Sequence, residues 1–164
     1  MRLLSVIILL GILCVPCIAQ DLPNQLVTAY IGFDQNSQPQ LFGGAAYAKQ
    51  VSGPFFSYSG YDVTPLLGET SQVAGMAIPK LKYSGYTGFS VRWAQIGDRL
   101  SFWSLATGGI ASTGGNTSGT VGVGSFGHVA LGRGWGLIMA MQVSHDGIVG
   151  TSYVPRIGIT YGSK

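Results

Sequence analysis

The sequence predicts an all-β protein: a closed antiparallel up-and-down β-barrel of about eight strands that crosses a membrane after an export signal is removed. Charged residues make up only 9% of the 164 residues, whereas about a quarter is typical of soluble domains. Glycine occurs 26 times, which disfavours long helices. Apolar and polar residues alternate with period two over long stretches. Much of the surface is therefore expected to face lipid.

The first nineteen residues are interpreted as an export signal. A basic residue precedes an apolar run over 3–12, and Cys17-Ile18-Ala19 forms a small-x-small cleavage site. The run is shorter than the roughly 20 residues that a membrane-spanning helix needs. We expect signal peptide 1–19 and a single β-barrel domain 20–164. Because Cys14 and Cys17 lie in the signal, the mature chain would have no disulfide.

Alternation is clearest in the last third of the chain. One face of segment 135–144 carries large apolar side chains, namely Trp135, Leu137, Met139, Met141 and Val143. The opposite face is mostly small or polar, namely Gly136, Ile138, Ala140, Gln142 and Ser144. Segment 153–161 repeats the pattern. In a transmembrane strand such alternation predicts a large apolar face toward lipid and a small or polar face toward the lumen.

Nine segments are predicted to be strands. Turn-rich pieces separate them and include 34–40, 64–71 and 112–119. Several segments reach ten or more residues, which matches a tilted strand crossing a bilayer better than the shorter strands of soluble proteins. Bacterial barrels have an even number of strands, so eight are expected, with one early segment merged or broken. The nine segments are 25–33, 41–51, 55–63, 73–83, 86–95, 100–110, 120–131, 135–144 and 153–161.

The signal, the cysteine-free mature chain, the alternating strands and the aromatic last strand together resemble the small eight-stranded outer-membrane barrels of the OmpA and OmpX type. The resemblance implies location in the outer membrane of a Gram-negative bacterium and contact with outer-membrane lipids. It also implies recognition by the barrel-assembly machinery during biogenesis, through an aromatic residue of the last strand. Here that residue is Tyr161, and 162–164 follow it.

No cluster predicts catalysis, cofactor binding or metal binding. His145 and Asp146 are adjacent, so in a strand they would point to opposite faces. His128 has no second ligand at a useful spacing. One glutamate and five aspartates leave little material for paired-carboxylate chemistry. Without Arg2 the net charge is +2, from eight basic and six acidic residues, too weak and scattered for nucleic acid.

Two groups of candidate site residues remain. Arg92, Gln142 and Arg156 fall on the small or polar faces of their strands, and are expected to form a polar network in the lumen. That network would either plug the barrel or tune a narrow passage. The plug is favoured, because side chains just fill an eight-stranded barrel. A second group is expected to form an aromatic girdle at the membrane interfaces, and consists of Trp93, Trp135, Tyr153 and Tyr161.

Three function hypotheses follow. The first is an outer-membrane barrel with a structural or surface-interaction role and no enzymatic activity. The second is a soluble β-sandwich or lipocalin-like barrel, secreted or periplasmic, that binds a ligand with its large apolar face inward. The third is a lipid-modifying enzyme on the same barrel, which would need a Ser or His cluster at one rim. No specific ligand or partner is indicated by the sequence.

Overall fold

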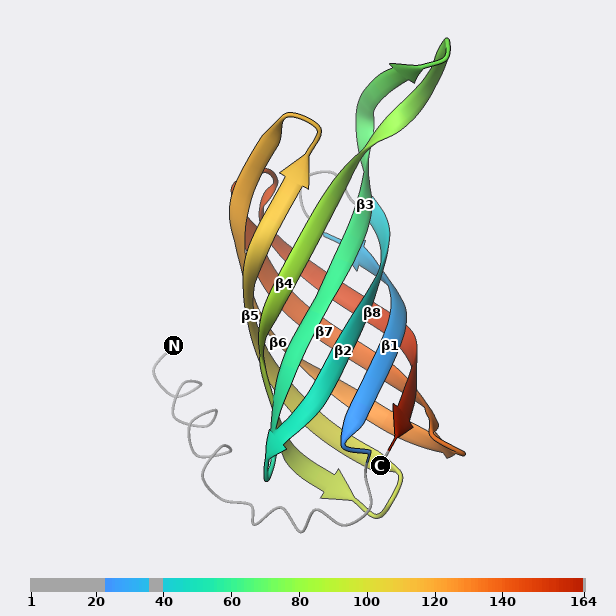
Figure 1. Ribbon diagram of the computed structural model, residues 1–164, viewed down its shortest axis with the longest axis vertical. Helices are drawn as coiled ribbons and strands as arrows, with labels where there is room; N and C mark the ends of the chain where they lie inside the picture. Colours follow the sequence, from blue (N-terminus) through green and yellow to red (C-terminus); the bar gives the residue numbers. More distant parts are fainter. Residues whose placement is uncertain (1–22, 36–39, 164) are drawn as a thin grey trace.

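The computed structural model describes residues 23–35 and 40–163, in which eight antiparallel strands close into a barrel (Figure 1). Each strand pairs with the next along the chain, and the last pairs with the first. The predicted closed up-and-down barrel is confirmed. Its strands are β1 (Gln25–Asp34), β2 (Gln40–Ser52), β3 (Phe55–Val73), β4 (Met76–Ile96), β5 (Leu100–Thr113), β6 (Asn116–Gly132), β7 (Trp135–Asp146) and β8 (Gly150–Ser163).

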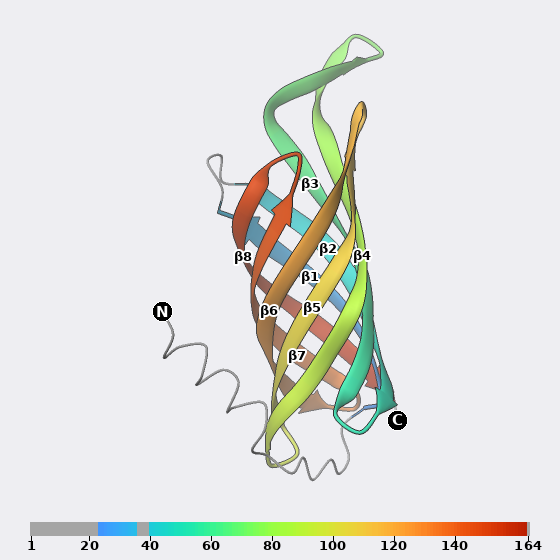
Figure 2. The ribbon, with the colours of Figure 1, turned by 90° about the vertical axis from the view of Figure 1, so that its left-hand side faces the viewer.

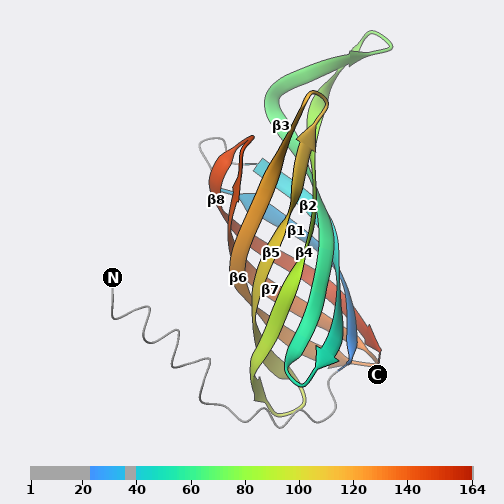
Figure 3. The same cartoon turned by 60° about the vertical axis from the view of Figure 1, so that its left-hand side comes forward.

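The two ends of the barrel differ. The end where β1 begins and β8 finishes carries three tight turns, formed by residues 53–54, 97–99 and 133–134. Gly53, Gly97 and Gly134, one in each of these turns, have positive φ. At the opposite end, the β3–β4 and β5–β6 hairpins rise well above the rest of the wall (Figures 2 and 3). We call these the turn end and the hairpin end.

The β3–β4 hairpin continues beyond its neighbours as a two-stranded ribbon. Strand β2 pairs with β3 only as far as Val63, and β5 pairs with β4 only from Tyr83 onward. Between these points β3 and β4 pair with each other alone, up to Val73 opposite Met76. Residues 64–82 therefore leave the barrel wall, as Figure 1 shows. We refer to them as the ribbon.

The ribbon corrects two sequence-based expectations. Segments 73–83 and 86–95 were separate in the prediction but form one strand, β4, which reduces nine segments to eight. The expected loop 64–71 belongs to β3 and pairs with β4 across a bulge between Leu66 and Thr70. Outside the wall a strand has no lipid face to cover, so its sequence can be polar and contain Pro65, as a strand with a free edge tolerates.

A third expectation, the loop at 112–119, is also wrong. Strand β5 continues to Thr113 and β6 begins at Asn116, which leaves Gly114-Gly115 as a two-residue turn. The hydroxyls of Ser112 and Thr117 lie 3.1 Å apart across the pair. The polar residues of 112–119 therefore belong to strands that extend beyond the lipid into water. There, contacts between hydroxyls of paired strands take the place of contacts with lipid.

The predicted assignment of faces is confirmed. On β7 the large apolar stripe is exposed, with Met139 71% accessible, whereas Ile138 and Gln142 on the other face are buried. On β8 Ile157 and Ile159 are exposed, and Arg156 and Thr160 are buried. The outer wall is thus apolar and the lumen is filled. A soluble barrel or sandwich with its apolar face inward is therefore ruled out.

The predicted export signal, residues 1–19, lies outside the described residues. Within the described ranges, no helix is long and apolar enough to span a membrane.

Candidate functional site

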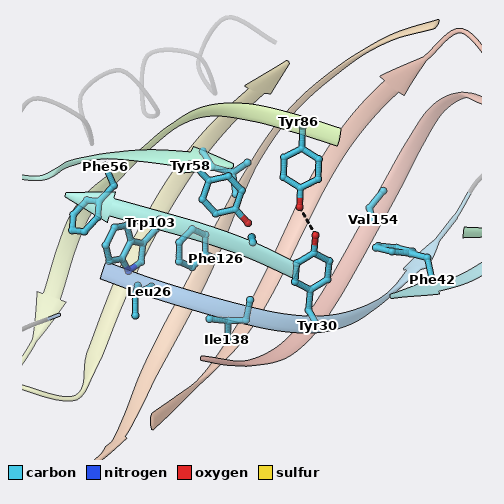
Figure 4. Packing of buried hydrophobic residues seen from close by; sticks show 13 residues of the cluster. Leu26, Tyr30, Phe42, Phe56, Tyr58, Tyr86, Trp103, Phe126, Ile138 and Val154 are labelled. Atoms are coloured by element: carbon cyan, nitrogen blue, oxygen red, sulfur yellow. Dashed lines mark hydrogen bonds between the residues drawn. The ribbon is translucent and has the colours of Figure 1, made fainter. Parts of the chain in front are cut away.

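Aromatic side chains fill the half of the lumen nearest the turn end (Figure 4). Trp103 is 1% exposed; it packs edge-on against Phe56, with ring centroids 4.5 Å apart, and stacks on Phe126 at 5.3 Å. Trp103 and Phe126 meet because they are a cross-strand pair of β5 and β6. Glycines and alanines on neighbouring strands leave room for these rings. The rings close this half of the barrel to solvent.

Arg92 lies among these rings. It comes from β4 and is 3% exposed, with its guanidinium carbon 5.5 Å from the ring centroids of both Phe56 and Trp103. A desolvated guanidinium is attracted to aromatic faces by the ring quadrupole. The sequence places Arg92 correctly on the inner face, and the structure adds its aromatic surroundings.

A second charged centre lies nearer the hairpin end. Arg156 Nη2 on β8 donates to Asp62 Oδ2 on β3 at 3.0 Å. The Tyr30 hydroxyl donates to Asp62 Oδ1 at 2.5 Å and is hydrogen-bonded to the hydroxyl of Tyr86, as Figure 4 shows. The guanidinium also lies 4.9 Å from the centroid of the Tyr30 ring. Both oxygens of the Asp62 carboxylate thus have a donor.

A third charged contact lies still closer to the hairpin end. Lys82 Nζ on β4 donates to Asp146 Oδ2 on β7 at 3.0 Å, and both side chains are about 6–7% exposed. The other Asp146 oxygen accepts from the backbone N–H groups of Ile148 and Val149, at 2.9 and 2.8 Å. Asp146 therefore ends β7 and caps the turn into β8 as well as neutralising the buried lysine.

Gln142 points into the lumen from β7 and is 5% exposed. Its side-chain N–H donates to the Thr107 hydroxyl on β5 at 3.3 Å. Arg92, Gln142 and Arg156 all lie inside the barrel, as their alternation indicates, with distinct direct partners: aromatic rings for Arg92, a hydroxyl for Gln142 and a carboxylate for Arg156.

Sequence reasoning missed most of the partners of these three residues. Asp62 on β3 and the buried Lys82 on β4 were not singled out as candidate site residues. A signal was present in both cases: Asp62 is in the even-numbered series with Phe56 and Tyr58, and Lys82 with Tyr86. Extending the alternation through the first half of the chain would have placed both on the inner face.

The lumen contains little free space. One cavity of about 40 Å³ lies near the hairpin end, among the charged residues, and another of about 20 Å³ lies among Leu26, Tyr58 and Ile138. About 10–15 Å³ of such space admits one water molecule, so these cavities hold one to a few solvent-sized groups each. The described side chains thus plug the barrel interior.

The four expected girdle residues are all exposed on the outer wall, between 38% and 58%. Trp93, Trp135 and Tyr161 lie toward the turn end, where Trp135 and Tyr161 are cross-strand neighbours with centroids 5.2 Å apart. Trp93 stacks on Phe102 at 5.5 Å. Tyr153 lies toward the hairpin end of β8. The four rings thus lie toward the two ends of the outer wall, and a girdle at the borders of the lipid stays a prediction.

The histidines do not lie with other chemistry-bearing groups. His145 is exposed and its Nδ1 lies 2.9 Å from the Thr151 hydroxyl, whereas Asp146 faces the lumen. His128 is buried, with Nε2 3.0 Å from the Thr160 hydroxyl. Among the described residues, no three His, Cys, Asp or Glu side chains gather as a metal site would require.

Packing around the Arg156–Asp62 pair leads to a first prediction, at Gly44. A Cβ on Gly44 would lie 2.5 Å from Asp62 Oδ1 and 2.7 Å from Tyr30 Cε2, whereas a Cβ on Gly43 has no neighbour nearer than 3.8 Å. Gly44→Ala should therefore lower the free energy of unfolding by about 1–3 kcal/mol, as overpacking does. Gly43→Ala is the matched control and should change it by less than about 1 kcal/mol.

Urea unfolding of both variants in detergent micelles, followed by tryptophan fluorescence, measures the difference. Equal stability of the two variants would show that the carboxylate and the tyrosine do not pack as tightly as the structure indicates.

These features define a class of protein: a small transmembrane β-barrel with an apolar outer wall and a plugged lumen. No protein-family model matches the sequence, and no curated protein matches it. Solved structures do match, and they are small outer-membrane barrels.

Neisserial surface protein A is 12% identical over 84% of this chain and 95% of its own, with a TM-score of 0.61. Ail, the attachment invasion locus protein of Yersinia pestis, is 12% identical over 84% of this chain and 95% of its own, with a TM-score of 0.51. Ail in a phospholipid bilayer nanodisc gives 11% identity over 83% and 97%, also at 0.51. At these identities the likeness shows the fold, and the fold together with the apolar wall places the chain in an outer membrane.

Proposed function

We propose that the protein is a non-enzymatic, non-conducting outer-membrane barrel that presents the ribbon as a surface for contact with other molecules. The observation that carries this proposal is the ribbon itself. Two strands leave the wall together and end in apolar side chains, with Val73 52%, Met76 66% and Ile78 42% exposed. Exposed apolar clusters on otherwise polar segments are typical of interaction sites.

The hairpin end is assigned to the cell exterior. Outer-membrane barrels have short periplasmic turns and longer extracellular loops. Here the two hairpins that project beyond the wall, β3–β4 and β5–β6, are both at the hairpin end, whereas the turn end carries only tight turns. Beside the ribbon, a cleft of about 530 Å³ separates it from the β5–β6 hairpin. Thr113, Asn116 and Thr117 line this cleft opposite Glu69 and Lys80, which provides polar groups next to the apolar tip.

Charge favours an apolar contact over an anionic one. The two lysines of the ribbon are both ion-paired, Lys80 with Glu69 at 3.3 Å and Lys82 with Asp146 at 3.0 Å. Ail has been solved in complex with the heparin analogue sucrose octasulfate. This ribbon has no unpaired basic residue for such a sulfated ligand, so we assign it a partner that presents apolar surface.

The first step of the test is topological. Because the predicted mature chain has no cysteine, single cysteines report location without background. Met76→Cys at the ribbon tip should react with a membrane-impermeant maleimide on intact cells, and Asp98→Cys at the turn end should react only after lysis. The reverse result would place the ribbon in the periplasm and refute the proposal.

The second step measures contact. Deleting residues 70–79 leaves Leu66 opposite Lys80, joined by 67–69, and three-residue hairpin loops are common. Cells of a laboratory Gram-negative strain with truncated lipopolysaccharide would be passed over octyl-agarose and heparin-agarose beads. We expect retention on octyl-agarose to fall several-fold with the deletion, and retention on heparin to stay unchanged.

The triple variant Val73→Ser, Met76→Ser and Ile78→Ser keeps the ribbon and removes its apolar side chains, and should reproduce the deletion on octyl-agarose. Retention that survives both changes would show that the ribbon is not the contact surface. Loss from heparin beads instead would assign it an anionic partner.

A further inference from the structure

The cavity near the hairpin end of the lumen contains a carboxylate that has no partner among the described residues. Three aspartates line this cavity, together with Lys82 and Arg156. Asp62 pairs with Arg156 and Asp146 pairs with Lys82, so both ion pairs are neutral. Asp34 is left as one uncompensated negative charge, although it is only 5% exposed.

Hydrogen bonding also distinguishes Asp34 from the other two aspartates. Both oxygens of Asp62 and both oxygens of Asp146 accept bonds from donors. Asp34 Oδ1 has no donor among the residues that the structure describes. A buried carboxylate oxygen without a hydrogen-bond donor is unfavourable. The position therefore favours a positive group, which the described residues do not supply.

Neighbouring side chains offer acceptors. Gln142 Oε1 lines the same cavity, is on a side chain 5% exposed, and has no donor among the described residues. Gln40, the cross-strand partner of Asp34, is 4% exposed, and its Oε1 also has no donor among the described residues. Hydroxyls of Ser84, Thr120 and Ser144 also line the cavity. Oxygen donors of this kind suit hard cations.

The register brings these acceptors to one level of the barrel. Gln142 on β7 lies opposite Val154 on β8, and the Gln35–Tyr153 bridge sets Asp34 on β1 beside that same part of β8. Asp34 in turn lies opposite Gln40 on β2. Four consecutive strands around the closing seam therefore present one carboxylate and two amide oxygens toward the lumen.

We propose that Asp34 and Gln142 bind a single monovalent cation, of the size of sodium, in this cavity, with Gln40 beside Asp34 as a further oxygen donor. The volume of about 40 Å³ is large enough for such an ion. The single uncompensated carboxylate balances the charge of one monovalent cation. Amide and hydroxyl oxygens complete the coordination shell of the ion. The ion would join β1 and β2 to β7 across the seam where the first and last strands pair.

The test uses the full-length mature barrel folded in a nonionic detergent. The fraction that remains folded after heating is read from gel migration without boiling, in NaCl, KCl or choline chloride at equal ionic strength. Ligand binding to the folded state alone raises the unfolding midpoint. We expect a rise of roughly 5 °C in NaCl or KCl over choline chloride, saturating with salt concentration.

Asp34→Asn keeps the side-chain volume and removes the charge, and should abolish the difference between salts. Asp98→Asn makes the same change on the exposed turn at the other end and should retain the difference. If Asp34→Asn fails to fold, ²³Na line broadening by the unmodified barrel, displaced by potassium but not by choline, gives the same information.

Identical midpoints in the three salts, without sodium broadening, would overturn the proposal and leave a water molecule or a proton at Asp34. A rise produced only by CaCl₂ would overturn the monovalent assignment. Persistence of the salt difference in Asp34→Asn would show that the ion binds elsewhere. None of these outcomes depends on the ribbon, so the proposed surface contact stands or fails separately.

Discussion

Replacing Arg156 with leucine is expected to lower the free energy of unfolding by about 3–5 kcal/mol, the usual cost of removing one partner of a buried ion pair. Asp62 would keep the hydrogen bond from Tyr30 but lose the only cation within 4 Å among the described residues. The guanidinium also packs over the Tyr30 ring, so its removal leaves a gap as well as a charge. Urea unfolding in nonionic detergent, followed by tryptophan fluorescence, measures the loss.

Two further variants separate charge from packing. Asp62→Leu combined with Arg156→Leu should recover part of the stability, because no uncompensated charge remains. Arg99→Leu removes the same side chain from an exposed turn and should change stability by less than about 0.5 kcal/mol. An Arg156→Leu barrel as stable as the parent would mean that the pair does not hold the lumen together.

Replacing Met139 with arginine is expected to lower the free energy of unfolding by about 2–4 kcal/mol, the cost of a basic side chain on the lipid face near the middle of a bilayer. Met139 is 71% exposed, lies in the middle of β7 and pairs with Ile157 on β8. Unfolding in lipid vesicles measures the effect, because detergent micelles reshape around a charge more easily than a bilayer does.

Met76→Arg is the matched control. Met76 is 66% exposed, close to the value for Met139, but it lies at the tip of the ribbon. There the same substitution should cost less than about 0.5 kcal/mol. Equal effects at the two positions would contradict a lipid-facing β7, since only a lipid face distinguishes them.

The barrel and its two faces could be predicted from the sequence because alternation reports directly on the wall. Each strand in the wall separates lipid from lumen, so its side chains must alternate, as Met139 and Gln142 show. The ribbon could not be predicted in this way. Apart from Thr64 and Lys82 at its base, which line the lumen cavity, its residues have no lipid on one side and no lumen on the other, and the stretch from Thr64 to Ser71 therefore resembled a loop.

The ion pairs inside the lumen could not be predicted from the sequence either. That Arg156 lies inside follows from its position on β8, but its partner depends on which strand lies across the interior and at what height. Asp62 is 94 residues away in sequence, and strand tilt and register set its height. The same holds for Lys82 and Asp146, which are 64 residues apart. The alternation of residues along a strand shows whether a side chain points into the lumen. Which residue it contacts across the lumen can be read only from the closed barrel.

The two internal ion pairs also have a mechanical consequence. Arg156–Asp62 joins β8 to β3, and Lys82–Asp146 joins β4 to β7. In the ring of eight, each of these links spans three strand steps, close to the full width of the tube. They act as struts that oppose flattening of the cross-section under the lateral pressure of the lipid. Beyond Lys82, the described ribbon residues have no such link to the far wall, so the molecule combines a braced barrel with a more compliant ribbon at its hairpin end.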